Sequence, residues 1–186
     1  MHTAYIALGS NLASRVGPPE STMASALTRL RSLGSVQKCS SLYSTTPVGF
    51  AEQPRFLNAV IALETELDPL HLLQALLCIE KEYGRERASG ILNGPRTLDL
   101  DILLLGDLYL NEPGLTLPHP RLPDRAFVLV PLNEIAPGLR MPGLEESVAD
   151  LLEALQRKCQ GESDAVLQVE SDRWSQSAAE AMGCPP

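Results

Sequence analysis

Two aspartates one residue apart, Asp99 and Asp101, lie in the stretch "GPRTLDLDILL", which begins at Gly94 and is otherwise rich in leucine. In a β-strand alternate side chains share a face. The spacing therefore predicts both aspartates on one face and, on the opposite face against a core, Leu98, Leu100, Ile102 and Leu104. Two neighbouring carboxylates repel each other unless cations lie between them, and their oxygens suit Mg²⁺ that also holds substrate phosphates. The pattern predicts phosphate transfer with bound metal.

Arginines gather around this strand. Five of the twelve arginines in the chain fall in residues 85–125, a window without lysine: Arg85, Arg87, Arg96, Arg121 and Arg125. Arginine suits bidentate phosphate contacts better than lysine does. The alternative is that the aspartates form ordinary ion pairs on a solvated face, which is the usual meaning of an isolated pair. The arginines and a nearby "PHPR" favour a site. Because the chain lacks G-x-x-x-x-G-K-[ST] and G-x-G-x-x-G, a nucleotide must be held by side chains and metal.

The composition sets broad limits on the class of protein. A chain of 186 residues with 44% hydrophobic and 20% charged residues predicts one globular domain rather than a disordered or fibrous protein. The net charge of −8 argues against nucleic-acid binding. The N-terminus lacks a basic segment followed by an apolar run, and no stretch is long enough to span a bilayer. We therefore expect a cytoplasmic protein without membrane contact, and the sequence indicates no obligate protein partner.

Hydrophobic periodicity gives the order of elements. A strand at 4–11, a helix at 18–34, strands at 36–45 and 56–65, a helix capped by Asp68 and ended by Gly84, and the strand containing the aspartates follow one another. This βαββαβ order predicts an α+β, ferredoxin-like fold with an antiparallel sheet, helices on one face and the active site on the other. We expect the last strand to lie centrally in the sheet.

The remaining chain predicts two further helices and a tail. "RAFVLVPLNEI" at 125–135 reads as a helix interrupted at Pro131, and "LEESVADLLEALQRKC" at 144–159 as another. Residues 161–186 are polar and rich in small residues, so we expect a loosely attached tail of unknown role, with a short strand or helix possible at "AVLQV".

Several motifs together identify a family. The chain resembles 6-hydroxymethyl-7,8-dihydropterin pyrophosphokinase, from about Ala4 to Pro137, in "AYIALGSNL", "YSTTPVGFAEQPRFLNAV", "IEKEYGRER", "GPRTLDLDILL" and "LTLPHPRLPDRAFVLVPLNEIAP". The resemblance implies a ferredoxin-like fold and a diphosphokinase of folate biosynthesis, occupying residues 1–160. It implies transfer of the terminal diphosphate of ATP to the hydroxymethyl group of 6-hydroxymethyl-7,8-dihydropterin, giving AMP and the pterin diphosphate. Two Mg²⁺ ions and ATP as co-substrate are implied as well.

The resemblance also assigns roles to residues. Asp99 and Asp101 are implied to hold the two metals, and Arg85 and Arg96 to act with them in catalysis. The implied ATP-binding residues are Glu80, Arg85, Arg87, Arg96, Ile102, Thr116, His119 and Arg125. The implied pterin-binding residues are Thr45, Val48, Phe56, Asn58 and Phe127. The two phenylalanines would sandwich the ring and Asn58 would hydrogen-bond its edge. Ordinary readings exist beside these: core packing for the phenylalanines, a turn for His119 and surface charge for Glu80.

A departure from the family pattern, a predicted lid and two alternative functions remain to be considered. Leu92 and Asn93 depart from the family pattern, in which a basic residue usually lies two positions before Gly94. We expect residues 85–93 to form a lid that orders when both substrates bind. Two other functions share this fold: a two-metal nucleotidyl transferase, which would release pyrophosphate, and a ferredoxin-like module that binds small molecules.

Overall fold

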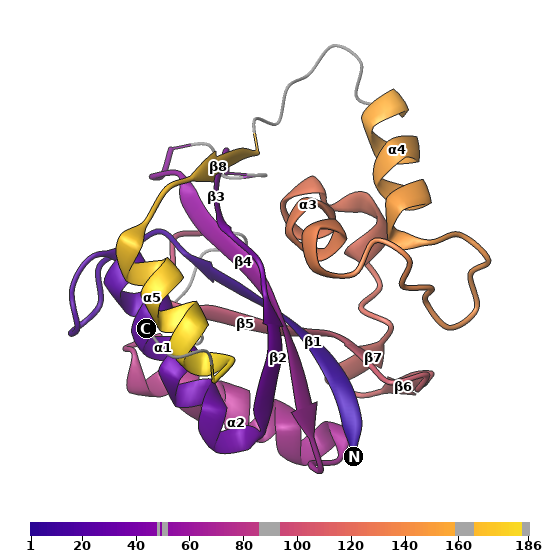
Figure 1. The fold of residues 1–186 in the computed structure, drawn as a ribbon, viewed down its shortest axis with the longest axis horizontal. Coiled ribbons are helices and arrows are strands. Elements are labelled where there is room, and N and C mark those ends of the chain that lie inside the picture. Colours follow the sequence, from indigo (N-terminus) through magenta and orange to yellow (C-terminus); the bar gives the residue numbers. More distant parts are fainter. Residues whose placement is uncertain (48, 50–51, 86–93, 159–165, 184–186) are drawn as a thin grey trace.

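The computed structural model describes residues 1–47, 49, 52–85, 94–158 and 166–183. It shows a mixed α+β fold built on one large antiparallel sheet (Figure 1). Its strands are β1 (His2–Ser10), β2 (Ser35–Cys39), β3 (Leu42–Thr45), β4 (Phe56–Thr65), β5 (Asp99–Leu105) and β8 (Leu167–Val169), with a separate hairpin of β6 (Leu110–Glu112) and β7 (Leu115–Leu117). The helices are α1 (Pro19–Leu30), α2 (Pro69–Glu82), α3 (Ala126–Ile135), α4 (Val148–Lys158) and α5 (Asp172–Ala181). The predicted ferredoxin-like βαββαβ order is confirmed, with β2 and β3 together in place of one strand.

The sheet brings distant parts of the chain to one end. Its order is β5-β1-β4-β3-β8, and β2 also pairs with β4. Strand β5 pairs with β1, and within the described part of the chain it has no second neighbour, so the expectation of a central position for this strand is wrong. In the register of the sheet, Gly9 of β1 lies opposite Asn58 of β4 and opposite Asp99 of β5. The end of β1 and the starts of β4 and β5, which are far apart in sequence, therefore lie side by side.

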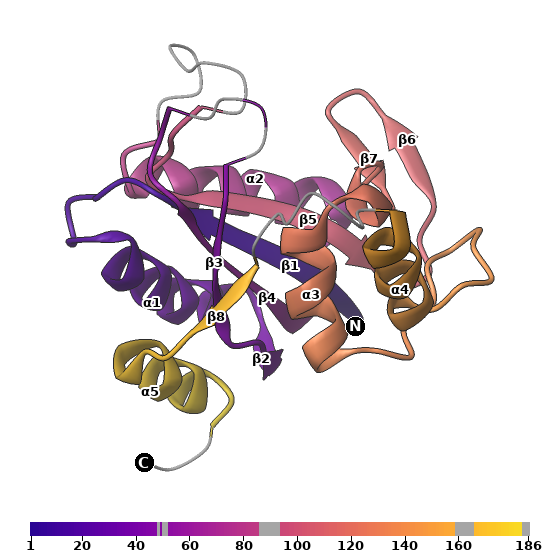
Figure 2. The same ribbon diagram turned by 90° about the horizontal axis from the view of Figure 1, so that it is seen from above.

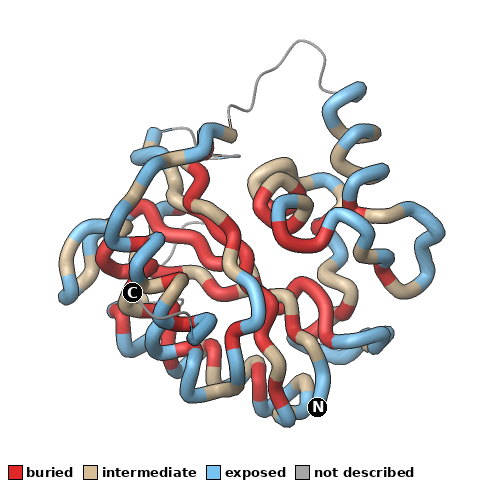
Figure 3. Tube along the Cα trace, in the orientation of Figure 1, coloured by how far each residue is buried: buried red, intermediate tan, exposed pale blue. Residues whose placement is uncertain are grey.

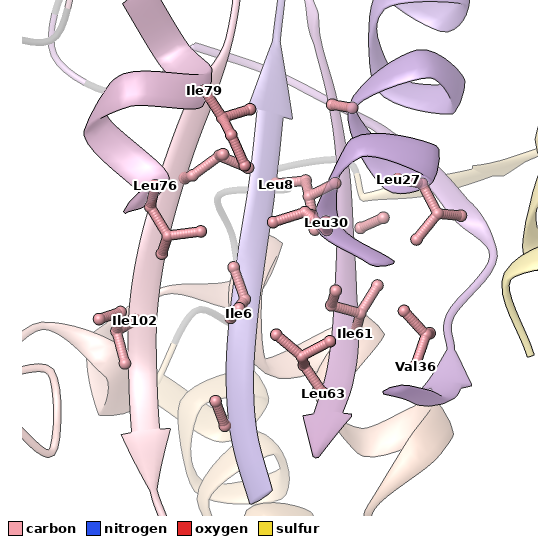
Figure 4. Packing of buried hydrophobic residues seen from close by; sticks show 14 of the residues in the cluster. Ile6, Leu8, Leu27, Leu30, Val36, Ile61, Leu63, Leu76, Ile79 and Ile102 are labelled. Carbon is pink, nitrogen blue, oxygen red and sulfur yellow. The ribbon is translucent and has the colours of Figure 1, made fainter. Parts of the chain in front are cut away.

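The main core lies between one face of the sheet and helices α1, α2 and α5 (Figure 2). Both long helices begin with proline, and the Asp68 carboxylate accepts hydrogen bonds from the backbone N–H groups of Leu70 and His71 at the start of α2. The predicted cap is thus confirmed. Aliphatic side chains make up most of this core, and fully burying one of them contributes about 1.5–3 kcal/mol to the stability of the fold. The side chains labelled in Figure 4 are Ile6, Leu8, Leu27, Leu30, Val36, Ile61, Leu63, Leu76, Ile79 and Ile102.

The opposite face carries a smaller core under α3 and α4. It includes Val60 and Ala62 of β4 and Leu103 and Leu104 of β5. Helices therefore cover part of this face too, whereas the sequence predicted helices on one face only. The predicted inward position of Leu104 is wrong, because the pairing of β5 with β1 shifts by one residue between Tyr5 and Ile6. A bulge of this kind breaks the alternation of side chains, so Leu103 and Leu104 both join the smaller core.

Helix α3 continues through Pro131, where an interruption was expected. A proline inside a helix lacks one backbone donor and crowds the preceding turn. Here Pro131 is buried, and the neighbouring Val128, Leu129 and Leu132 pack against the sheet. Tertiary packing therefore holds the helix together across a residue that local propensity would use to break it.

The C-terminal segment is part of the fold. Strand β8 pairs with β3, and α5 packs against α1 with Trp174 only 2% exposed in the main core. The expectation of a loosely attached tail is therefore wrong for residues 167–181. Figure 3 shows buried residues along the central strands, while many residues of α4 and α5 are exposed. None of the helices in the described ranges has the length and apolar character that crossing a membrane requires.

Candidate active site

The site lies where β1, β4 and β5 meet on the face that α3 partly covers. Gly9 stands between Asn58 and Asp99 in the pairing of the strands. A Cβ atom at Gly9 would lie 3.2 Å from Asn58 Oδ1 and 3.7 Å from the Asp99 Cβ atom. The first contact is tighter than ordinary packing allows without movement. Glycine therefore lets the amide and the carboxylate approach each other across the central strand.

Asp99 is held by two arginines. Its Oδ1 atom accepts from Arg85 Nη1, and its Oδ2 atom accepts from Arg96 Nη1. The side chains of these three residues are 15–23% exposed, so the ion pairs are largely shielded from water. Charge-assisted hydrogen bonds in such surroundings fix geometry well. The structure thus brings together the predicted aspartate and two of its predicted arginines.

Glu80, on helix α2, supports the position of Arg85 beside Asp99. Its Oε1 atom accepts from Arg85 Nη1 at 2.5 Å and from the backbone N–H of Leu100 at 2.8 Å, and the residue is 1% exposed. Burial alone would lower the pKa of Arg85, but the charges of Asp99 and Glu80 outweigh burial and raise that pKa. Arg85 is therefore a fixed cation. The predicted contact between Glu80 and ATP stays a prediction, and what the geometry displays is support of Arg85.

Asp101 lies two residues further along β5 and is less tightly paired. The distance from its Oδ2 atom to Arg125 Nη1 is 3.7 Å, and its side chain is 36% exposed. Burial and then the charge of Asp99 raise the pKa of Asp101, although His119 and Arg125 act in the opposite direction. Burial lowers the pKa of Arg125 despite the nearby Asp101. The raised pKa of Asp101 reflects its burial first and the charge of Asp99 second, and a cation bound by the two carboxylates would offset their repulsion.

These two carboxylates are suitable ligands for a hard cation. Within the described ranges, no group of three or more His, Cys, Asp or Glu side chains gathers in a way that could hold a metal by itself. A Mg²⁺ ion commonly takes only one or two carboxylates from the protein and completes its shell with phosphate oxygens and water. Asp99 and Asp101 fit that pattern. They fit a metal that arrives with a polyphosphate better than a permanently bound one.

His119 lies beside Asp101 in a fixed orientation. Its backbone N–H donates to the carbonyl of Leu103 at 2.9 Å, and its Nδ1 atom accepts from the backbone N–H of Arg121 at 3.2 Å. Burial lowers the pKa of His119, although Asp101 raises it. A neutral imidazole with Nδ1 as acceptor carries its proton on Nε2. His119 therefore offers an Nε2–H donor next to the carboxylate pair.

Apolar rings and neutral polar groups line the neighbouring part of the site. Asn58 Nδ2 donates to Thr45 Oγ1 at 2.7 Å, and the two residues are 8% and 3% exposed. The guanidinium carbon of Arg96 lies 5.2 Å from the centroid of the Phe56 ring, and that of Arg125 lies 5.4 Å from the centroid of Phe127. Cation–π contacts of this kind hold each ring next to its arginine. The predicted sandwich of a ligand between the rings stays a prediction.

Asn11 is a site residue that the sequence analysis missed. Its Oδ1 atom accepts from the backbone N–H of Arg96 at 2.8 Å, while its Nδ2 atom donates to Gln53 Oε1 and to the carbonyl of Pro54, both at 3.0 Å. Asn11 thus connects the segment before β4 to the segment before β5. Its neighbour Ser10 donates to the carbonyl of Thr97 at 2.6 Å. A polar "GSN" closing an apolar strand was the available signal.

The other predicted site residues differ in what the structure displays. Thr116 lies on β7, where its hydroxyl donates to Asn111 Oδ1 at 3.3 Å, and the Ile102 side chain points into the main core. A contact of Ile102 with a nucleotide would therefore involve its backbone. Val48, Arg87, Leu92, Asn93 and the predicted lid, apart from Arg85, lie outside the described residues.

Comparison with known proteins identifies the family of this chain. Residues 5–137 match the family described as 7,8-dihydro-6-hydroxymethylpterin-pyrophosphokinase (HPPK). A curated relative from Pseudomonas aeruginosa, named 2-amino-4-hydroxy-6-hydroxymethyldihydropteridine pyrophosphokinase, is 49% identical over 140 residues, covering 74% of this chain and 83% of the relative. A relative of the same name from Bacillus subtilis is 45% identical over 132 residues, covering 71% and 77%.

Solved structures agree on the fold. A crystal structure of Plasmodium falciparum HPPK-DHPS superposes with a TM-score of 0.70 at 15% identity, over 88% of this chain and 45% of the larger one. The chain therefore spans about half the length of that solved protein. The match to the family covers most of this chain and includes all the site residues described above. The chain belongs to the 7,8-dihydro-6-hydroxymethylpterin-pyrophosphokinase family.

Proposed function

We propose that this member of the family transfers the diphosphate of ATP to the hydroxymethyl group of 6-hydroxymethyl-7,8-dihydropterin, giving AMP and the pterin diphosphate for folate biosynthesis. The observation that carries the proposal is the meeting of two kinds of site across Gly9. Asp99 with its arginines lies on one side, and the Asn58–Thr45 pair lies on the other. A polyphosphate suits the first group and the edge of a heterocycle suits the second. ATP is the co-substrate that the family uses.

Charge balance supports the phosphate side of this proposal. Asp99 and Asp101 would hold the cations of a magnesium triphosphate, and the arginine partners of Asp99 would then be free to bind its phosphate oxygens. Arg85 and Arg96 then bind phosphate oxygens. Arg125, at the start of α3, lies close enough to Asp101 to bind them as well. His119 donates from Nε2 to an oxygen of the nucleotide. Arg87, Ile102 and Thr116 remain proposed ATP contacts, as the family resemblance implies.

The pterin side uses shape and neutral hydrogen bonds. Asn58 has one amide hydrogen engaged by Thr45, and its remaining donor and acceptor groups suit the edge of a pterin. The rings of Phe56 and Phe127, each held by an arginine, provide apolar faces for stacking. Val48 completes the proposed set. Together these groups would hold the ring so that its hydroxymethyl group points toward the phosphate side.

In the reaction, the hydroxymethyl oxygen forms a bond to the β-phosphorus while the bond from that phosphorus to the oxygen bridging to the α-phosphate breaks. AMP leaves with the bridging oxygen, and the proton of the hydroxymethyl group is released to solvent. Two Mg²⁺ ions held by Asp99 and Asp101 would neutralise charge on the transferring and leaving groups. The arginines bind the equatorial oxygens, where charge spreads in the transition state. Holding the two substrates in line is the main contribution of the protein.

A product assay tests the proposal directly. The protein is incubated with ATP, Mg²⁺ and 6-hydroxymethyl-7,8-dihydropterin, and the nucleotides are separated by chromatography. Stoichiometric AMP with a diphosphorylated pterin is the expected result. ADP would indicate attack at the γ-phosphorus by a simple kinase, and pyrophosphate would indicate a nucleotidyl transferase. Binding of pterin without any product would favour a binding module. The cytoplasmic location and the lack of an obligate protein partner stay predictions.

A further inference from the structure

The C-terminal segment Leu167–Ala181 lies beyond residues 5–137, the part of the chain that matches the family. Besides the pairing of β8 with β3, two of its side chains donate hydrogen bonds to the corner Ser40–Ser41 between β2 and β3. We propose that this segment is a positioning element for the heterocycle side of the active site, acting through the Ser40–Ser41 corner. The inference rests on the proposed function and adds a selective role in pterin binding for residues outside the family match.

Trp174 makes the first of two contacts with the corner. Its indole Nε1–H donates to the carbonyl of Ser40 at 2.8 Å, in a position where the ring is buried. The indole is fixed by the start of α5, since Ser171 Oγ accepts from the backbone N–H of Trp174 at 3.0 Å and also bonds to Glu20 of α1. Ser40 in turn exchanges hydrogen bonds with Val60: its N–H donates to the Val60 carbonyl at 2.9 Å, and its Oγ accepts from the Val60 N–H at 3.0 Å.

Gln168 makes the second contact, from β8. This strand pairs with β3 through Leu42–Val169, Tyr43–Gln168 and Ser44–Leu167. The side-chain Nε2 of Gln168 donates to Ser41 Oγ at 3.0 Å. The same hydroxyl donates to Glu134 Oε1 at 2.8 Å, and the Ser41 N–H donates to Glu134 Oε2 at 2.9 Å. The corner is therefore connected to the last turns of α3.

Tyr43 closes the connection between β3 and α3. Its hydroxyl donates to Glu134 Oε2 at 2.9 Å, next to the bond from Ser41. Burial, and then the neighbouring Glu134, raise the pKa of Tyr43 to about 12, so the phenol remains a donor at physiological pH. One carboxylate thus accepts three hydrogen bonds from β3 and the residue just before it. Such a set fixes the distance between the strand and the helix.

The corner joins three elements, and each carries a pterin-side residue. Thr45 ends β3, Asn58 lies two residues before Val60 on β4, and Phe127 lies on α3, the helix that carries Glu134. The hydrogen bonds of the corner named above reach β3, β4, α3 and α5, whereas Arg85, Asp99 and Glu80 lie on or next to α2 and β5. Loosening the corner would therefore shift the pterin-side groups relative to one another, while the phosphate-side groups on α2 and β5 stay in place. A stacked and hydrogen-bonded ligand is sensitive to small shifts of this kind.

Two substitutions test the proposal in the full-length protein. Trp174→Phe removes the indole donor and keeps most of the apolar ring. Gln168→Ala removes an exposed side chain and leaves the β8 backbone pairing in place. For each variant, the dissociation constants of the pterin and of a non-hydrolysable ATP analogue with Mg²⁺ are measured separately by calorimetry, together with KM for each substrate and kcat. Both variants are expected to raise the pterin dissociation constant and KM, about five- to tenfold for Trp174→Phe and less for Gln168→Ala, with ATP affinity within about twofold.

Two control variants separate positioning from stability. Gln176→Ala removes a side chain from the same helix that bonds only to Glu180 among the hydrogen bonds of the described residues, and it should leave both affinities unchanged. Leu63→Val removes a methylene from the far end of β4, where Leu63 pairs with Ala4 and Val36. It lowers thermal stability and should leave the ratio of the two affinities unchanged.

Each outcome decides the matter. A selective rise in the pterin dissociation constant in both variants supports the proposal. Equal losses for pterin and ATP, or a lower melting temperature with unchanged affinities, would mean that the segment is only structural. If the wild-type protein binds pterin but releases no AMP, the proposed reaction fails while the positioning test still applies. If wild type binds no pterin, both proposals fail together.

Discussion

The two halves of the active site are held together by different physical means. On the phosphate side, Asp99, Arg85 and Glu80 form a chain of ion pairs with full charges at short range. On the pterin side, Asn58 and Thr45 form a neutral hydrogen bond, and the two phenylalanines contribute apolar surface. On the phosphate side, substrate groups can take the place of either partner in an ion pair. Phosphate oxygens can replace a carboxylate beside an arginine, and a metal ion can replace an arginine beside Asp99. The pterin side depends on the relative positions of groups carried by three separate elements, β3, β4 and α3.

This difference predicts how each half responds to change. Ionic groups tolerate small displacements, because Coulomb attraction falls slowly with distance, but they do not tolerate loss of a charge. Stacked rings and neutral hydrogen bonds tolerate little displacement, because their energies fall within fractions of an ångström. Charge-removing substitutions should therefore affect catalysis most, and substitutions that only move atoms should affect pterin binding most.

The largest effect is expected for Asp101→Asn. This change removes a metal ligand's charge without changing volume, so turnover should fall by about a thousandfold or more while the fold is retained. AMP release at saturating Mg²⁺ gives the rate, and circular dichroism checks the fold. Asp107→Asn, in the exposed turn after β5, is the matched control and should retain full activity. Asp99→Asn should be equally inactive, because it also removes the partner of two arginines. Turnover within a few-fold of wild type would exclude the metal role.

Phe127→Ala and Asn58→Ala come next and test the pterin side. The first removes a stacking face, and the second leaves the buried Thr45 hydroxyl without its amide partner. We expect pterin affinity to fall about ten- to a hundredfold for each, with ATP affinity nearly unchanged. Calorimetric titration with each ligand measures both. Tyr109→Ala removes a ring that is 74% exposed and serves as the control. Equal losses for both ligands would point to general destabilisation and would break the comparison between the two halves.

Gly9→Ala tests displacement without loss of any group. The new Cβ atom would lie 3.2 Å from Asn58 Oδ1 but 3.7 Å from the Asp99 Cβ atom, so the amide must move and the aspartate need not. We expect a several-fold loss of pterin affinity and a smaller change for ATP. Gly138→Ala, where an added Cβ meets nothing within 4 Å, is the control. Loss of ATP affinity as large as that of pterin affinity would show that the phosphate side is no more tolerant than the pterin side.

The smallest effect is expected from the cap of α2, the helix that carries Glu80. Backbone and side-chain hydrogen bonds from His71 lower the pKa of Asp68. A carboxyl whose folded pKa is lowered stabilises the fold above its unfolded value, and this contribution is lost as the pH falls through the folded value. The difference in melting temperature between wild type and Asp68→Ala should therefore be constant near neutral pH and shrink below pH 3.8. Asp68→Asn keeps a capping oxygen and should lose less. Kinetic constants at neutral pH should stay unchanged, because the cap lies far from Glu80 along α2.

The sequence by itself determined the parts of this protein that depend on local pattern. Alternation along "LDLDI" places Leu98, Leu100 and Ile102 in the main core and leaves both aspartates on the other face, as observed. The Asp68 cap and the βαββαβ order follow from residues within a few positions of one another. The motifs that identified the family are also short and local. Such features are set by backbone geometry and hydrophobic period, which a linear sequence displays directly.

Only the tertiary structure decided the features that depend on pairing between distant segments. The bulge in β5 that moves Leu104 to the smaller core arises from the register with β1, and the edge position of β5 arises from the strand order. Asn11 becomes a site residue only because β1 and the segment before β5 end together. Trp174 is a single buried ring in a polar segment, so the average composition of residues 161–186 did not predict that this segment packs against the core. Each of these outcomes is a sum of contacts between residues far apart in the chain, which local propensity does not contain.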